Sequence, residues 1–272
     1  MDNLNNITLN ITEIFFSLQG EAKEVGLPTV FVRLTGCPLR CNYCDTAYAF
    51  KGNNPLTISH ILNEVSKYNT PYICVTGGEP MAQSNCLKLL DSLIEAGYKV
   101  SMETSGSIDI TPVNSKVSIV MDIKTPSSTE EKQNRYENLS VLQSKDQLKF
   151  VIASRSDFDW SCDLLKKNQV KSEVLFSPVY ESLEPFQLAD WILEKTQFVN
   201  NLIDKNIART IWPFFNLKMT FTREQIKLSV LLDQNNTPEF KELNATWLRQ
   251  EKNQKAQQNS SILNLQIDEA KG

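Results

Sequence analysis

Apolar segments rich in β-branched residues alternate along this chain with segments of helical period, and this alternation constrains the fold most strongly. It is typical of βα units that build a largely parallel sheet. Strands are predicted at residues 29–35, 72–76, 99–103, 117–123, 148–152 and 173–177. Helices are predicted at residues 58–65, behind Thr57 as N-cap, at 86–94, which Gly97 ends, and at 157–167 and 184–195. The sequence therefore predicts an α/β fold.

Each of the first four predicted strands runs into a polar or glycine-containing motif. These motifs are the loop after residue 35, the pair Gly77-Gly78, the run Glu-Thr-Ser-Gly at 103–106 and the polar stretch at 122–128. In parallel βα architectures the reactive groups collect at the carboxyl ends of the strands. We therefore expect all four motifs to face one cavity.

The first of these loops carries Cys37, Cys41 and Cys44 with the spacing C-x3-C-x2-C. Three thiolates can hold three irons of a [4Fe–4S] cluster and leave the fourth iron without a protein ligand. Such an open position can bind a small molecule, as in catalytic metal sites. A cluster with an open iron is the first expectation for this loop.

Two other readings of the cysteines remain as alternatives. A structural zinc site would need a fourth ligand, and the single histidine, His60, lies in a helical pattern. Disulfides are less expected, because the chain has no apolar leader and six cysteines in 272 residues, which favours a reducing, cytoplasmic location. Cys74, Cys86 and Cys162 fall in apolar patterns and are expected to be inert.

Charge and hydropathy narrow the class of partner. The net charge of −4 gives no basic footprint for nucleic acid, so we expect no nucleic-acid partner. No apolar run reaches the roughly 18 residues that a membrane span needs, so we expect no membrane partner. A small-molecule substrate is the remaining expectation for a chain that can bury one substantial core.

The cysteine loop and the later run Thr76-Gly-Gly-Glu-Pro80 together resemble the radical S-adenosylmethionine (SAM) family. The resemblance implies an incomplete (β/α) barrel in which the methionyl group of SAM chelates the open iron. One electron from the cluster then cleaves the sulfonium, and the released 5′-deoxyadenosyl radical abstracts a substrate hydrogen. Glycines let the backbone approach SAM closely, although a lone Gly-Gly is ordinarily a turn.

Within that family, the runs at 14–21, 31–37 and 44–46 resemble those of the 7-carboxy-7-deazaguanine synthases. The resemblance covers about residues 10–195. It implies a lyase that contracts 6-carboxy-5,6,7,8-tetrahydropterin to 7-carboxy-7-deazaguanine with loss of ammonia, in queuosine biosynthesis. It also implies a flavodoxin- or ferredoxin-like electron donor.

The resemblance assigns binding roles by position and names no catalytic residue. Substrate contacts fall on Leu18, Gln19, Gly20, Arg33 and Thr76. SAM contacts fall on Tyr43, Cys44, Asp45, Gly77, Gly78, Glu79, Ser105, Lys124 and Ser127. Thr46 is the implied protein ligand of a Mg²⁺ on the substrate carboxylate, which Arg33 pairs with. Taken alone, Thr46 would be a helix N-cap or a turn hydroxyl, Arg33 an exposed strand arginine, and Lys124 the partner of Asp122 in an ion pair.

After about residue 195 the chain departs from that family. A Leu-Gln-x-His-Lys-like element is absent, and residues 200–213 take its place. We predict a core domain at 1–213, a helical extension at 214–252 and a disordered tail at 253–272. The extension is expected to pack on its own domain, with homodimerisation or partner binding as the alternative.

Two other functions stay open at this point. One is an activase that generates a glycyl radical on a partner protein, since its cysteine spacing can be the same. The other is a non-catalytic iron–sulfur or zinc protein with a degenerate C-terminal region. The activase would leave the run at 18–21 and Thr46 unexplained.

Overall fold

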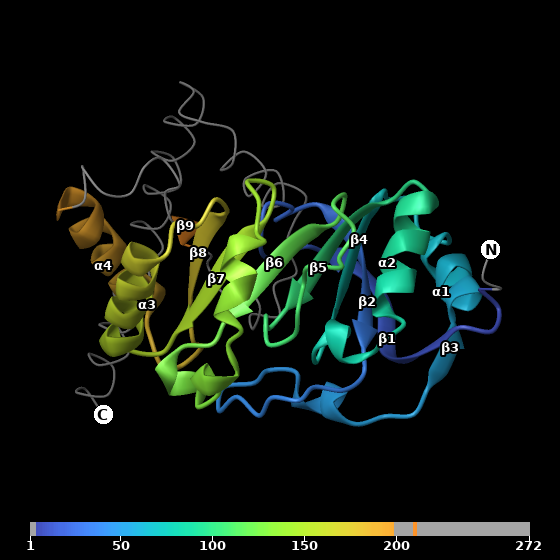
Figure 1. The fold of residues 1–272 in the computed structure, drawn as a ribbon, viewed down its shortest axis with the longest axis horizontal. Helices are drawn as coiled ribbons and strands as arrows, with labels where there is room; N and C mark the ends of the chain where they lie inside the picture. Colours follow the sequence, from blue (N-terminus) through green and yellow to red (C-terminus); the bar gives the residue numbers. More distant parts are fainter. Residues whose placement is uncertain (1–3, 199–208, 211–272) are drawn as a thin grey trace, which may run out of the picture. The chain divides into compact units, whose positions relative to one another are not determined.

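The computed structural model describes residues 4–198 and 209–210. Within these residues one sheet runs in the order β3-β1-β2-β4-β5-β6-β7-β8-β9. Neighbouring strands from β2 onwards are parallel, whereas β1 pairs antiparallel with β2 and β3 (Figure 1). The strands are β1 (Thr8–Leu18), β2 (Pro28–Leu34), β3 (Pro55–Thr57), β4 (Tyr72–Gly77), β5 (Lys99–Thr104), β6 (Ser118–Ile123), β7 (Gln147–Ile152), β8 (Glu173–Pro178) and β9 (Arg209–Thr210).

This near-sequential parallel order is that of an opened (β/α) barrel, which confirms the predicted fold class. In the described part of the chain, four α-helices accompany the strands: α1 (Ile58–Val65), α2 (Cys86–Glu95), α3 (Arg155–Lys167) and α4 (Pro185–Phe198). The six strands and four helices predicted between residues 29 and 195 are all present, with ends that move by a few residues at most.

Local chemistry sets the helix ends where the sequence predicted them. The Thr57 side chain accepts a hydrogen bond from the His60 amide at 3.1 Å and caps α1. Gly97 follows α2 with φ of +91°, a left-handed conformation that glycine adopts without strain. Both signals belong to short segments, which explains why sequence reasoning finds them.

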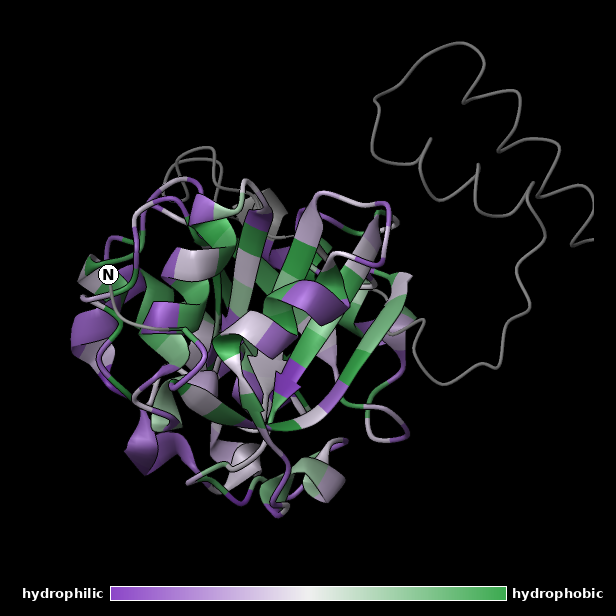
Figure 2. Ribbon diagram, turned by 90° about the vertical axis from the view of Figure 1, so that its right-hand side faces the viewer, coloured by the Kyte–Doolittle hydropathy of each residue, from purple (hydrophilic) through white to green (hydrophobic). Residues whose placement is uncertain are grey.

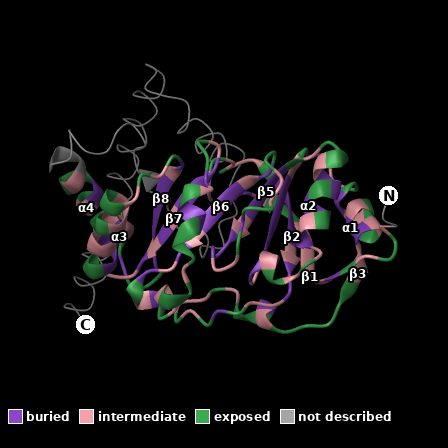
Figure 3. Ribbon diagram, in the orientation of Figure 1, coloured by how far each residue is buried: buried purple, intermediate pink, exposed green. Residues whose placement is uncertain are grey.

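Apolar side chains of the strands and helices form one core. Val30, Val32 and Leu34 of β2 belong to the same buried cluster as Ile61 of α1 and Leu89 of α2. The strands are hydrophobic along much of their length (Figure 2), and they are buried while the helices expose their outer faces (Figure 3). Because the middle of each strand is buried in this core, polar side chains are found mainly where the strands end.

Strand β1 was not predicted as a strand, although its last residues were singled out as a motif. Its pairing changes partway, because its first residues pair with β3 and the later ones with β2, with a register shift between Ile11 and Glu13. Irregular pairing of this kind blurs the alternation of apolar and polar residues that marks a strand.

The segment between Ser128 and Lys145 contains two 3-10 turns, Glu131–Gln133 and Tyr136–Ser140. Asn138 is 1% exposed; its amide donates to the carbonyls of Gly106 and Ile108 at 2.9 and 2.8 Å. This buried amide organises the loop through single hydrogen bonds, which a helical period does not reveal.

None of the helices in the described part of the chain combines the length and apolar character needed to cross a membrane. The predicted domain boundaries at 213/214 and 252/253, the predicted helical extension and the predicted tail lie outside the described residues.

Candidate active site

The cysteine loop follows β2 and is fixed to the chain on two sides. The Gly36 amide donates to the Ala49 carbonyl at 2.8 Å, which ties the loop to the 3-10 turn η1 (Ala47–Phe50). The Asn42 amide donates to the Ser128 carbonyl at 3.2 Å, beyond the end of β6. The loop therefore spans from β2 to the β6 end, as the strand-end argument predicted.

Cys37, Cys41 and Cys44 are all half-buried on this loop. Burial raises the pKa of Cys37 and of Cys41, and the neighbouring thiols raise both further. Three half-buried thiols on one short loop fit the three-cysteine ligation of a [4Fe–4S] cluster. Among the residues that the structure describes, no group of three His, Cys, Asp or Glu side chains is arranged around a common metal position.

Gly77 and Gly78 are required by the packing of this loop. A Cβ at Gly78 would lie 2.4 Å from the Gly36 carbonyl oxygen and 2.6 Å from Cys37 Cβ. At Gly77 a Cβ would lie 2.3 Å from the Leu34 carbonyl oxygen. The two glycines let the end of β4 touch the cysteine loop, a reason additional to the close approach of SAM that the sequence suggested.

Glu79 lies beneath the site and is wholly buried. Its carboxylate accepts hydrogen bonds from Thr104 Oγ1 at 2.9 Å, from the Ser105 amide at 2.7 Å and from Ser105 Oγ at 2.5 Å. A second link runs from the Glu79 amide to the Gly36 carbonyl at 2.9 Å. Glu79 thus joins the cysteine loop to the end of β5, and its side chain does so from inside the protein.

Glu103 begins the strand-end run Glu-Thr-Ser-Gly that was expected to face the cavity, although the sequence assigned it no role of its own. Thr76 Oγ1 donates to Glu103 Oε2 at 2.8 Å, and Gln19 Nε2 donates to Oε1 at 3.3 Å. Gln19 is 3% exposed, and its own oxygen accepts from the Gly20 amide at 2.8 Å. Two of the predicted substrate residues therefore meet at one carboxylate. The Glu-Thr-Ser-Gly run at a strand end was the available signal for it.

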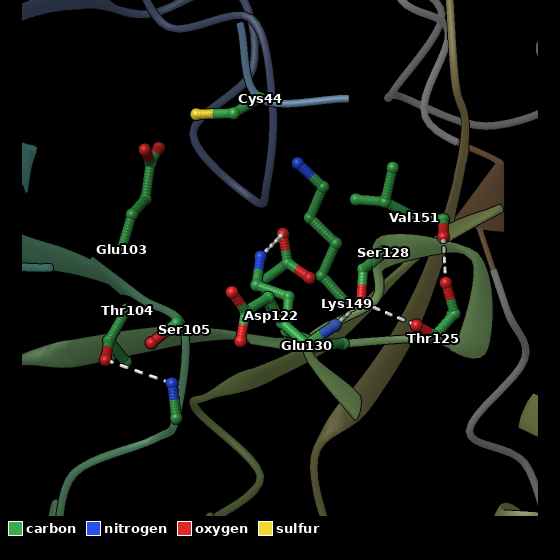
Figure 4. Close-up of polar contacts among 12 residues, drawn as sticks. Cys44, Glu103, Thr104, Ser105, Asp122, Thr125, Ser128, Glu130, Lys149 and Val151 are labelled. Atoms are coloured by element: carbon green, nitrogen blue, oxygen red, sulfur yellow. Dashed lines mark hydrogen bonds and ion pairs between the residues drawn. The ribbon is translucent and has the colours of Figure 1, made fainter. Parts of the chain in front are cut away.

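Lys149 of β7 brings positive charge to the same interior, and it was missed from the sequence. Its ammonium forms an ion pair with Glu21. Burial alone would lower the pKa of Lys149, but the carboxylates of Glu21 and Asp122 outweigh burial and raise it. Figure 4 shows Glu103 and Lys149 pointing to the side on which Cys44 lies. No periodic pattern marks an inward lysine on a buried strand.

The β6 end holds a second pair of opposite charges. Lys124 Nζ lies 3.1 Å from Asp122 Oδ2, which is the ordinary ion pair considered for these residues. The other oxygen, Asp122 Oδ1, is buried without a hydrogen-bond partner among the described residues. A buried carboxylate oxygen without a donor is costly, so a ligand that donates to it would be stabilised there.

Tyr43 and Ser127 lie around this strand end. Tyr43 Oη is 3.3 Å from Thr125 Oγ1, and burial raises the pKa of Tyr43 to about 12. The Ser127 amide donates to Asp157 Oδ1 at 3.0 Å, which anchors the loop after β6 to α3. Both predicted SAM residues therefore sit on loops that other elements hold in place.

Thr46 occupies the N-cap position of η1, yet its side chain makes no capping hydrogen bond. Its hydroxyl lies 3.8 Å from Cys44 Sγ. Asp45 beside it is exposed. The ordinary reading of Thr46 as a capping hydroxyl therefore finds no hydrogen bond to support it, and the hydroxyl stays next to a cluster cysteine.

Arg33 is not an exposed strand arginine, because its side chain is only 14% exposed. Its Nε donates to Glu13 Oε1 at 2.7 Å across the β1–β2 pair. Leu18, another predicted substrate residue, ends β1 beside Gln19. The substrate residues therefore come from β1, β2 and β4 together.

A separate hollow of about 280 Å³ lies at the amino ends of the strands, where Thr29, Tyr72 and Lys99 line it. It contains none of the residues of the motifs described above. The motif-bearing carboxyl ends of the strands are the better candidate site, because buried acidic, basic and thiol groups converge there.

Comparison with known proteins agrees with this geometry. Residues 31–127 match the model of the Radical SAM superfamily. The chain is 37% identical over 203 residues to 7-carboxy-7-deazaguanine synthase of Koribacter versatilis, covering 68% of this chain and 90% of that protein. It is 38% identical over 190 residues to the synthase of Chlorobaculum tepidum, covering 68% and 86%.

A solved structure, QueE from Escherichia coli, shares the fold with a TM-score of 0.61 at 20% identity, covering 71% of this chain and 93% of that one. At this identity the likeness concerns the fold alone. The sequence relatives carry the assignment further, since the chain covers most of their length. On this evidence the chain belongs to the 7-carboxy-7-deazaguanine synthase family of the Radical SAM superfamily.

Proposed function

We propose that this chain converts 6-carboxy-5,6,7,8-tetrahydropterin into 7-carboxy-7-deazaguanine with loss of ammonia, in queuosine biosynthesis. The observation that carries the proposal is the 37% identity to a synthase over 90% of that protein's length. The relatives described above bear the synthase name, which favours this reaction over glycyl-radical activation. The match to the Radical SAM superfamily also favours an iron–sulfur enzyme over a zinc protein.

Cys37, Cys41 and Cys44 would hold the [4Fe–4S] cluster, and SAM would bind beside it. When bound, these two groups supply the electron and the radical that start the reaction. The chain positions the two groups. Gly77 and Gly78 let the segment after β4 pack against the cysteine loop, and Glu79 links both segments to the end of β5.

The remaining SAM contacts come from two sides. Tyr43, Cys44 and Asp45 flank the nucleoside from the cysteine loop. Ser105, Lys124 and Ser127 face it from the ends of β5 and β6. The unpartnered Asp122 Oδ1 supports a hydrogen-bond donor of the ligand at this edge.

The substrate lies against the residues from β1, β2 and β4. Gln19 and Thr76 hold Glu103 by two hydrogen bonds, so this carboxylate accepts from pterin N–H groups in a fixed direction. Leu18 and Gly20 contact the ring beside Gln19. Arg33 pairs with the substrate carboxylate, and Lys149 adds positive charge to the same interior.

Thr46 would supply the protein ligand of a Mg²⁺ ion, which would help to neutralise the substrate carboxylate. The position of Thr46 supports this role, because its hydroxyl lies 3.8 Å from Sγ of the cluster cysteine Cys44 and makes no capping hydrogen bond. One protein ligand suits Mg²⁺, which keeps water and substrate oxygens around it.

The electron donor is a flavodoxin- or ferredoxin-like protein, and the enzyme works in the cytoplasm. The cluster cysteines support a protein donor, since the loop that carries them is half-exposed. Homodimerisation is the proposed alternative role of the C-terminal extension.

The test is an anaerobic assay of the reconstituted full-length protein with SAM, Mg²⁺, a reductant and 6-carboxytetrahydropterin, followed by mass spectrometry. We expect 7-carboxy-7-deazaguanine and 5′-deoxyadenosine. Release of 5′-deoxyadenosine without the deazaguanine would contradict the substrate assignment and move it to another molecule. Absence of both products from protein with a full cluster would contradict the radical reaction itself.

A further inference from the structure

Glu13 and Tyr48 enclose the Arg33 guanidinium, although no sequence motif drew attention to either residue. Glu13 lies opposite Arg33 in the β1–β2 pair. Its Oε1 accepts from Arg33 Nε at 2.7 Å and from Tyr48 Oη at 2.8 Å. One carboxylate oxygen thus binds a strand arginine and a tyrosine from η1 at the same time.

Aromatic rings fix the plane of the guanidinium. Arg33 Cζ lies 5.7 Å from the centroid of the Phe15 ring and 5.9 Å from that of the Tyr48 ring. Phe15 in turn stacks on Phe31 at 4.9 Å with an interplanar angle of 7°. Because cation–π contacts and the Glu13 bond act together, Arg33 has little freedom to swing.

A guanidinium can meet a carboxylate either at the edge that contains Nε or at the edge formed by its two terminal nitrogens. Glu13 occupies Nε. A second carboxylate therefore binds best at the terminal pair. Tyr48 also lies two residues after Thr46. The same short turn therefore carries both the tyrosine ring beside Arg33 and the hydroxyl assigned to Mg²⁺.

We propose that Glu13 and Tyr48 are positioning residues that present the terminal nitrogens of Arg33 to the substrate carboxylate. They thereby select a pterin with a 6-carboxylate over a pterin without one. This inference rests on the proposed function, because the pairing of Arg33 with that carboxylate is part of it.

The test compares Glu13→Ala, Glu13→Gln and Tyr48→Phe with wild type, all as reconstituted full-length protein with SAM and Mg²⁺. Binding of 6-carboxypterin and of unsubstituted pterin is measured by fluorescence. For Glu13→Ala we expect the Kd of 6-carboxypterin to rise about tenfold, equivalent to about 1.4 kcal/mol, and the Kd of pterin to stay within about twofold. In turnover, KM rises more than kcat falls.

The conservative variants separate orientation from charge. Glu13→Gln keeps an acceptor oxygen and is expected to restore the Kd of 6-carboxypterin to within about threefold of wild type. Tyr48→Phe keeps the ring and loses one hydrogen bond, so its effect is expected to lie between those of the two Glu13 variants. The control is Glu194→Ala, which breaks the 3.0 Å pair with Arg155 on the outer helices; we expect neither Kd to change.

Equal weakening of both pterins in Glu13→Ala would overturn the inference, because it would indicate a general structural role. An unchanged Kd of 6-carboxypterin would overturn it as well. Both results leave the proposed function standing as long as wild-type protein makes 7-carboxy-7-deazaguanine. Failure of wild-type turnover, with intact cluster and SAM cleavage, would instead overturn the proposed function.

Discussion

Gly78 shows how one hydrogen-sized side chain controls the assembly of the cluster loop. Its Cα lies so close to the loop that an added Cβ would meet a carbonyl oxygen at 2.4 Å and a cysteine Cβ at 2.6 Å. Backbone on one side and a ligand residue on the other leave little room for relaxation. Glycine is therefore required at position 78 for the packing of the cysteine loop, independently of any contact with SAM.

We expect Gly78→Ala to displace Cys37 and to reduce the iron bound per chain after anaerobic reconstitution. Overpacking of this kind typically costs about 1–3 kcal/mol, so the protein should still fold. Iron and sulfide analysis measures the loss, and urea unfolding of the iron-free protein measures the fold. Gly52→Ala is the matched control, because its Cβ would meet only the Thr35 side chain at 3.3 Å. Equal iron content in both variants would contradict the packing argument.

Thr46 carries the second residue-scale prediction. Thr46→Ala removes the hydroxyl proposed for Mg²⁺, so turnover should fall and its dependence on Mg²⁺ should weaken, while iron content stays at the wild-type level. Initial rates over a Mg²⁺ titration measure this. Thr46→Ser, which keeps a hydroxyl, is the control. A Thr46→Ala enzyme with the wild-type Mg²⁺ response would remove Thr46 from the site.

Among the elements, the end of β5 depends on a single buried carboxylate. Glu79→Gln replaces a carboxylate that accepts from four donor groups with an amide, whose NH₂ group meets donors at Thr104 and Ser105. We expect a loss of about 1–3 kcal/mol in the free energy of unfolding. Urea denaturation measures it, with Glu95→Gln on the exposed end of α2 as control. Equal free energies of unfolding in the two variants would show that the hydrogen bonds of the Glu79 carboxylate do not stabilise the fold.

The same elements explain how far sequence reasoning reached. Strands and helices with a clean period were predicted, as were the cysteine loop, the glycine pair and the motif at the end of β5. Lys149 was missed, and Glu103 was given no role although its motif was found, because nothing local distinguishes an inward charged residue from a surface one until neighbouring strands are placed. Asn138 was missed for a similar reason, since its three partners lie about thirty residues away. Long-range hydrogen bonds are invisible to a periodic pattern.

At the scale of the whole molecule, the cluster loop connects distant parts of the sheet. Backbone hydrogen bonds connect it to η1, to Glu79 in the segment after β4 and to Ser128 in the segment after β6. A group that binds this loop in the folded state and not in the unfolded chain must stabilise the entire domain. Cluster binding and global unfolding are therefore thermodynamically linked.

We expect anaerobic removal of the cluster with a chelator to lower the Tm, by about 4–8 °C if binding contributes about 2 kcal/mol. Differential scanning calorimetry of loaded and stripped protein measures the shift. The Cys162→Ala variant, which lacks a half-buried cysteine of α3, should show the same Tm shift. The Cys41→Ala variant should show no shift, because the cluster loses one of its three ligands. A stripped protein with the Tm of the loaded form would mean that the loop binds the cluster without coupling it to the sheet, against the hydrogen bonds that join the two.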